Sequence, residues 1–171
     1  MGVLYDYYRA VDREAAIVRP DLGRAAGVRI LPGEPVFDGV DAKGIDPTVI
    51  LAQLIGFIRG VPWSSDLVDV MTLYPPREGA PTTDEEWDAL PEDSPYLDGP
   101  GIEELSISVR DTLADVDDER LPELARQWTG IEEFRIGHVD SDYLLSLIEA
   151  LVGLARRAKK EDQLLYCWVC V

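Results

Sequence analysis

The residue spacing with the most recognisable chemistry is a Cys-x-x-Cys sequence, Cys167 to Cys170. Redox pairs with this spacing need the first thiol at the N-terminus of a helix, where the helix dipole lowers the pKa of the thiol. Here the pair lies in a continuous apolar run, Leu164 to Val171, that has the length of a strand. Residues three apart in a strand point to opposite faces, so the two thiols should not meet without a turn. The sequence therefore favours two packed cysteines over a redox pair, and it leaves open whether Cys167 and Cys170 have any redox role.

The single histidine, His138, is a candidate general base or metal ligand. Nucleophilic catalysis also needs a nucleophile and an orienting group, and no local signature for either surrounds His138. Together with the two cysteines it provides only three soft ligands, fewer than a structural zinc site uses. His138 follows Gly137 in a predicted turn before Asp140, so we expect it to be structural or exposed.

Close groups of carboxylates could bind a hard cation or act as an acid and a base. They occur at Asp117-Asp118, at Glu103-Glu104 and at Asp84-Glu85-Glu86, but a chain with 33 acidic residues contains such groups by chance. No calcium-loop order and no glycine-rich phosphate loop is present. We therefore expect no metal and no cofactor. A hydrolase or metal-dependent enzyme that combines clustered carboxylates with His138 is the alternative interpretation.

The charge of the chain is concentrated in its middle. The 171 residues carry a net charge of −17, of which residues 1–77 contribute −2, residues 78–123 contribute −14 and residues 124–171 contribute −1. Affinity for nucleic acid or for anionic lipid depends on Lys and Arg. We therefore expect neither nucleic acid nor membrane as a partner, which leaves a basic protein. Acidity that only keeps the protein soluble and monomeric is the other interpretation.

The most acidic stretch, Glu78 to Asp98, has eight carboxylates and no basic residue, and six of the twelve prolines lie between Pro75 and Pro100. Such a composition lacks the apolar periodicity that offsets the entropy cost of ordering, so the sequence predicts an acidic surface loop over residues 75–101. Loops of this length are usually functional. Four apolar side chains are expected to hold the loop against the protein surface: Trp87, Leu90, Tyr96 and Leu97.

The main functional hypothesis is a non-enzymatic protein that binds a basic partner through this loop, as immunity proteins and acidic regulators do. Electrostatic attraction speeds such an encounter and makes it sensitive to salt, and aromatic side chains anchor it. A small-ligand binder, or a subunit that acts only in an assembly, is a third possibility that the sequence does not separate from the first. The predicted partner-binding residues are six carboxylates and two aromatic residues: Asp84, Glu85, Glu86, Asp88, Glu92, Asp93, Trp87 and Tyr96.

The elements that must position these residues indicate a single α+β domain over residues 1–171, in which about four to five helices pack with a small sheet. Strands are predicted over residues 4–9, 28–31, 67–74, 102–105 and 164–171, with a helix start at Ser64 or Ser65 as the competing interpretation of the third. Helix-start signals precede five apolar-periodic segments: Asp12, Asp46-Pro47, Ser106, Asp118 and Asp140.

Three features in order resemble the YfbM-like proteins (DUF1877), which are small α+β bacterial proteins. The features are a helix from Ile50 to Gly60, the series Gly99-Pro100, Leu105-Ser106, Val109, Leu113 and Asp117, and the series Asp142-Tyr143-Leu144, Leu151 and Ala155 before a final apolar strand. The resemblance covers about the last two thirds of the chain. It implies a fold and no particular activity.

The composition also bears on the compartment. The longest candidate for a membrane span, Thr48 to Ile58, is far shorter than the roughly 20 residues that a helix needs to cross a bilayer. Asp6 and Arg9 interrupt the apolar residues at the N-terminus, unlike a signal peptide. Two cysteines cannot supply a disulfide framework. We expect a cytoplasmic protein.

Overall fold

The computed structural model describes residues 2–18, 37–97 and 99–170. Within them, five antiparallel strands form one sheet in the order β2-β1-β5-β4-β3. The strands are β1 (Leu4–Ala10), β2 (Gly39–Asp41), β3 (Val70–Tyr74), β4 (Gly101–Leu105) and β5 (Leu164–Cys170). The helices are α1 (Arg13–Ala16), α2 (Ala52–Arg59), α3 (Asp84–Asp88), α4 (Ile107–Ala114), α5 (Leu121–Thr129), α6 (Glu132–Gly137) and α7 (Ser141–Lys160). The protein is an α+β fold, as predicted.

The apolar run near the C-terminus forms β5, the central strand of the sheet. It pairs with β1 along its whole length, from Leu4 opposite Cys170 to Ala10 opposite Leu164, and with β4 on its other side. Both faces of β5 are covered, which explains why its sequence is continuously apolar and does not alternate. The predicted strand over residues 28–31 lies outside the described residues. The three-residue strand β2 was not predicted.

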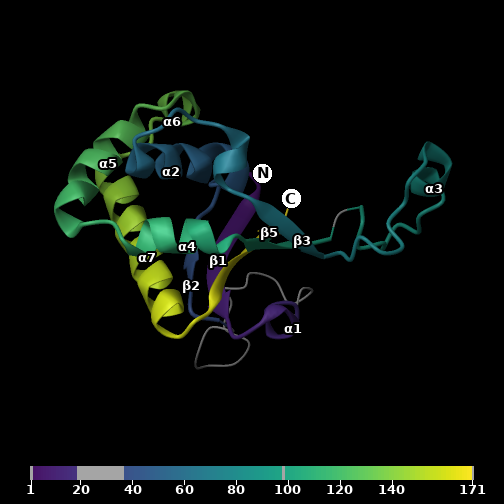
Figure 1. Ribbon diagram of the computed structural model, residues 1–171. Coiled ribbons are helices and arrows are strands. Elements are labelled where there is room, and N and C mark those ends of the chain that lie inside the picture. The colour runs from purple at the N-terminus through teal and green to yellow at the C-terminus, as the bar shows by residue number, and fades with distance from the viewer. Residues whose placement is uncertain (1, 19–36, 98, 171) are drawn as a thin grey trace, which may run out of the picture.

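The helices α2, α4, α5 and α7 cover one face of the sheet, and α1 lies against the other face (Figure 1). The longest helix, α7, turns an apolar stripe toward the sheet and toward α4 and α5. On the opposite face, the Tyr8 hydroxyl donates to the Ala16 carbonyl at 2.7 Å and fixes α1 to β1. The buried residues of α7 are Leu144, Leu147, Ile148, Leu151, Val152, Leu154, Ala155 and Ala158. Tyr143, in the first turn of α7, is 49% exposed.

The segment that begins at Asp46-Pro47 shows how local signals place a helix. The Asp46 carboxylate accepts hydrogen bonds from the amides of Thr48, Val49 and Ile50, and a short π-helix (η1, Pro47–Leu51) leads into α2. The helix ends at Gly60, whose φ of 68° is in the left-handed region that glycine adopts without strain. The predicted start and stop of this helix are confirmed.

The segment from Ser64 to Tyr74 contains both a helical turn and a strand, the two structures that its sequence predicted. Ser64 caps a 3-10 turn (η2, Ser65–Leu67), and β3 begins only at Val70. The predicted strand therefore started three residues too early, because its first apolar residues belong to the turn. A second 3-10 turn (η3, Asp118–Arg120) precedes α5, where Asp118 was expected to begin a helix.

In the described ranges, no helix combines the length and the apolar composition that a membrane span requires.

Candidate functional site

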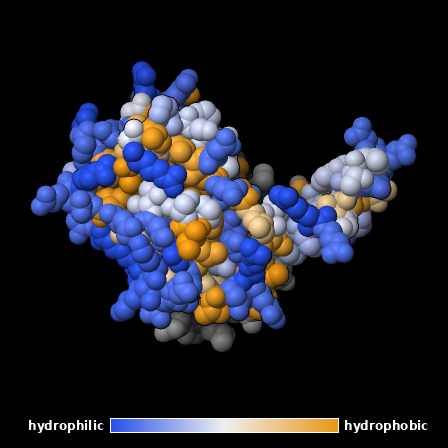
Figure 2. Space-filling view, viewed as in Figure 1, coloured by the Kyte–Doolittle hydropathy of each residue, from blue (hydrophilic) through white to orange (hydrophobic). Residues whose placement is uncertain are grey.

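The acidic region forms an arm that projects from the edge of the sheet. We use this name for the described residues between Pro75 and Pro100. The chain leaves the sheet at Tyr74 and returns opposite it, at Ile102, so both ends of the arm lie side by side. From there the arm extends away from the body of the protein, with α3 at its tip (Figure 1). Figure 2 shows hydrophilic residues at the tip and along the arm.

The tip of the arm is an ordered helical turn and not a structureless loop. Thr83 caps α3, and its hydroxyl accepts a hydrogen bond from the Glu86 amide at 3.3 Å. In return, the Glu86 carboxylate accepts the amide of Thr82 at 2.6 Å, its hydroxyl at 2.9 Å and the amide of Thr83 at 3.3 Å. These hydrogen bonds lower the pKa of the Glu86 carboxyl, and the bonds from Thr82 have the largest effect. The sequence signal was the capping box Thr83-x-x-Glu86, which the loop interpretation missed.

The apolar residues of the arm do not hold it against the body, contrary to the expectation. Trp87 and Leu97 are each 44% exposed, and neither belongs to the buried clusters of the sheet and helices. The Tyr96 hydroxyl donates within the arm, to the Pro76 carbonyl at 2.8 Å. Because this bond joins the outgoing half of the arm to its returning half, Tyr96 stabilises the arm itself. Leu90, also partly exposed, lies outside those clusters as well.

The predicted partner-binding carboxylates fall into two groups. Asp84, Glu85 and Asp88 lie on α3 at the tip, whereas Glu92 and Asp93 line a hollow where the arm joins the sheet. All five are exposed. The hollow has a volume of about 320 Å³, and its lining residues are Tyr74, Glu92, Asp93, Ser94, Pro95, Gly99 and Pro100. Glu86 is different, since its carboxylate is occupied by the capping box.

Among the described residues, no ion pair involves a carboxylate of the arm. The only basic residue of the arm is Arg77, near its base. The charge of the arm is therefore directed to solvent, together with the exposed side chains of Trp87 and Leu97. Leu97 is an exposed apolar residue of the arm that the predicted partner-binding set does not include.

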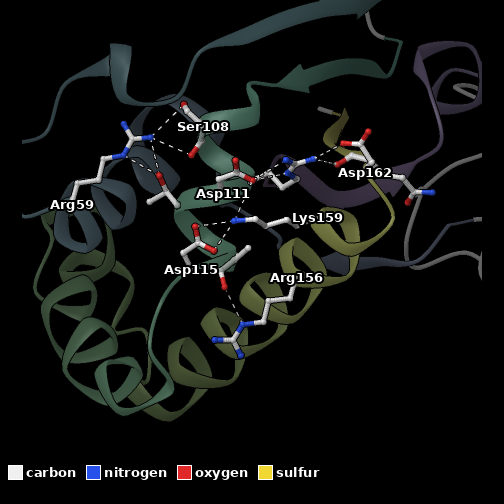
Figure 3. Close-up of polar contacts among 11 residues, drawn as sticks. Arg59, Ser108, Asp111, Asp115, Arg156, Lys159 and Asp162 are labelled. Atoms are coloured by element: carbon white, nitrogen blue, oxygen red, sulfur yellow. Dashed lines mark hydrogen bonds and ion pairs between the residues drawn. The ribbon is translucent and has the colours of Figure 1, made fainter.

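In the rest of the acidic region, from Glu103 to Glu123, most carboxylates form ion pairs with basic residues. Figure 3 shows Lys159 between Asp111 and Asp115. Lys159 of α7 binds both carboxylate oxygens of Asp115, at 2.7 and 2.9 Å, and Arg156 binds Asp118 at 2.8 Å. The other pairs are Arg13 with Glu104, Arg110 with Asp111, and Arg126 with Glu123. The concentration of charge seen in the sequence thus divides into a paired part and an unpaired arm.

In the described ranges, His138 and clustered carboxylates do not form the active site that the enzyme hypothesis requires. His138 is exposed, with a φ of 49°, at the C-terminal cap of α6, a helix that was not predicted. No group of three or more potential metal ligands occurs in the part of the chain that the structure describes. Glu103 is partly buried, and burial, followed by repulsion from Asp46, raises the pKa of its carboxyl. No cluster with His138 accompanies it.

The two cysteines lie on opposite faces of the sheet, as predicted. Cys167 is buried under the helices, and Cys170 packs with the cluster on the other face. Both are free thiols. Burial raises the pKa of the Cys167 thiol well above its usual value, which disfavours the thiolate that redox chemistry needs. The Cys-x-x-Cys sequence is a consequence of strand packing.

Comparison of the chain with protein-family models, with characterised proteins and with solved structures found no match. The resemblance to the YfbM-like proteins therefore stays a prediction.

Proposed function

We propose that this protein binds a basic protein partner through its acidic arm, in the manner of an immunity protein or an acidic regulator. The observation that carries the proposal is the contrast in pairing. The carboxylates from Glu104 to Glu123 are mostly matched by internal cations, whereas those of the arm have no ion-pair partner among the described residues. A surface of unmatched charge is the kind that a complementary partner can neutralise.

The shape of the arm supports the same function. A projecting element can enter a concave surface on a partner, while the charge along it attracts that partner over a distance of about 10 Å at moderate salt. Trp87 at the tip provides the kind of large aromatic side chain that dominates interface energies. Internal bonds of Tyr96 and Glu86 order the arm in advance, which lowers the entropy cost of binding.

The experiment compares two variants with the same change in net charge. In the arm variant, five carboxylates become amides: Asp84→Asn, Glu85→Gln, Asp88→Asn, Glu92→Gln and Asp93→Asn. In the control variant, five exposed carboxylates of the body without an ion pair among the described residues become amides: Asp117→Asn, Glu119→Gln, Glu132→Gln, Glu149→Gln and Glu161→Gln. Both variants carry −12 in place of −17, because five negative charges are removed.

The partner is captured from native lysate at low salt, released at high salt and identified, and its association rate with each variant is then measured. We expect the arm variant to associate at least about tenfold more slowly than wild type at low salt, with a weaker salt dependence. The control variant should associate within about twofold of wild type. Equal association rates for the two variants would show that net charge alone matters and would overturn the proposal.

A further inference from the structure

Among the residues that the structure describes, no strand pairs with the outer edge of β3, at the base of the arm. In the sheet order β3 is terminal, and its only strand partner among the described residues is β4. All five of its residues are at least partly exposed, in contrast to the buried centre of β5. Open edges of this kind are templates for another strand, and natural proteins use them to bind extended peptides.

The register identifies the backbone groups that point outward. The Ser106 amide donates to the Asp69 carbonyl at 3.0 Å, so Asp69 faces β4 just before the strand begins. Residues that face the partner strand alternate with residues that face away from it. With Met71 opposite Glu104 and Thr72 opposite Glu103, the amides and carbonyls of Val70 and Thr72 are directed to the open edge. Two residues thus offer paired donors and acceptors to an incoming strand.

The side of β3 away from the helices offers space for the side chains of that strand. Met71 is 46% exposed there and lines a hollow of about 290 Å³. Glu104 also lines the hollow, and Arg13 binds its carboxylate through two hydrogen bonds of 2.7 and 2.8 Å. Its lining residues are Asp69, Val70, Met71, Arg77, Glu104 and Ser106.

The charges at the two ends of β3 indicate which kind of peptide strand can bind to its edge. Asp66 and Asp69 are exposed just before β3, with no ion pair among the described residues, and the acidic arm follows its other end. Arg77, near the base of the arm, is the one basic residue in β3 and the arm. A basic segment is therefore complementary at both ends of the strand. A second copy of this chain is disfavoured. In an antiparallel pair of two β3 edges each acidic arm would lie near Asp66 and Asp69 of the other copy, and in a parallel pair the two arms would lie side by side.

We infer that the outer edge of β3 is a docking site for an extended basic segment of the partner, which adds a strand to the sheet at the base of the arm. This inference rests on the proposed function, because it assigns to the same partner a second contact. The arm attracts and orients the partner, and backbone hydrogen bonds to Val70 and Thr72 hold one of its segments.

The test uses a fluorescently labelled probe, acetyl-Lys-Val-Lys-Val-Lys-Val-Lys-amide, with the full-length protein at low salt. The variant Thr72→Pro removes an outward N–H and places a ring at the edge, yet it leaves the bonds to β4 intact. Thr72→Val is the matched control, since it changes the side chain and keeps the amide. We expect the Thr72→Pro variant to bind the probe at least about tenfold more weakly than wild type, and the Thr72→Val variant to bind it within about twofold. Circular dichroism verifies that both variants are folded.

A second probe separates strand addition from attraction of charge alone. It has the same side chains with every backbone amide N-methylated, and we expect its affinity to fall at least about tenfold. Equal binding of the two probes, equal binding by the two Thr72 variants, or no binding of the first probe to wild type would overturn the inference. A wild-type dimer that Thr72→Pro converts to a monomer would also overturn it, because the edge would then hold a second copy. The proposed function is tested by a different measurement, the association rate of the arm variant, so its failure can be distinguished from failure of this inference.

Discussion

The body of the protein and its arm use acidic residues in opposite ways. In the body, carboxylates of α4 and of the segment after it are held by basic side chains of α7, such as Lys159 on Asp115 and Arg156 on Asp118. In the arm, no carboxylate has such a partner among the described residues. The net charge of −17 is thus no guide by itself to where a protein can bind. What matters is where the carboxylates that remain unpaired after folding are concentrated, as they are on the arm.

One tryptophan of the body, Trp128, and the tryptophan of the arm, Trp87, lie in opposite environments, and this difference gives the largest predicted effect. Trp128 is fully buried, donates its indole N–H to the Ile50 carbonyl at 2.9 Å and contacts the Phe134 ring edge-on. Trp87 is 44% exposed on the arm. We expect Trp128→Ala to lower the free energy of unfolding by about 3–5 kcal/mol. Trp87→Ala should change it by less than about 0.5 kcal/mol. Urea titration followed by circular dichroism measures both.

A conservative variant checks the cause of this difference. Trp128→Phe keeps much of the buried ring and loses the hydrogen bond to Ile50, so its cost should lie between those of wild type and Trp128→Ala, at about 1–3 kcal/mol. If Trp87→Ala were as costly as Trp128→Ala, the arm would be part of the folded core. The division of the molecule into body and arm would then be wrong.

Much of the body could be predicted from sequence because its signals are local. Asp46-Pro47 and Gly60 bound a helix through their own hydrogen bonds and backbone preference, and the apolar run of β5 follows from burial on both faces. The helix α7 follows from its apolar stripe and its first-turn cap at Asp140. These features depend on residues within one or two turns of each other, which a single sequence contains.

The candidate site was only partly predictable, because its key property is a relation between distant residues. The acidic composition placed the site between residues 75 and 101, but the pairing of Glu104 with Arg13, 91 positions away, exists only in the folded chain. The same holds for Asp118 and Arg156. The loop interpretation also gave too much weight to composition, since one capping box at Thr83 was enough to form a turn of helix. The hydrogen bond from the Tyr96 hydroxyl to the Pro76 carbonyl, 20 positions away, likewise exists only in the folded chain.

Two adjacent glutamates of β4 give a smaller and more specific prediction. Glu103 faces the helices, and burial, followed by repulsion from Asp46, raises the pKa of its carboxyl. The folded state therefore retains this proton to a higher pH than the unfolded chain does. The stabilisation is complete below the unfolded pKa, about 4.3, and is lost as pH rises through the folded pKa. We expect Glu103→Gln to raise the free energy of unfolding at pH 7 by about 0.5–1 kcal/mol and to leave it unchanged at pH 4.

Glu104 is the matched control, because it points to the other face and binds Arg13. Glu104→Gln removes the charge from an ion pair in which the carboxylate is buried and Arg13 is exposed, so it should lower the free energy of unfolding at pH 7 by about 1 kcal/mol. Chemical denaturation at pH 4 and pH 7 measures both variants. A loss of stability for Glu103→Gln at pH 7 would mean that its carboxylate has a favourable partner, and the assigned cause of its raised pKa would be wrong.

The smallest predicted effect concerns the arm, where Glu86 behaves oppositely to Glu103. Hydrogen bonds from Thr82, and then from Thr83, lower the pKa of the Glu86 carboxyl. Its contribution to the order of α3 is therefore present above the unfolded pKa and is lost as pH falls through the folded pKa, below about 4.3. We expect the NMR shift of the Thr82 amide to follow this titration in wild type and in Glu85→Gln. In Glu86→Gln, whose amide oxygen still accepts hydrogen bonds, the shift should not titrate. A titration that persists in Glu86→Gln would assign the order of the arm to another carboxylate, and the arm would then not be ordered by its own capping box before a partner binds.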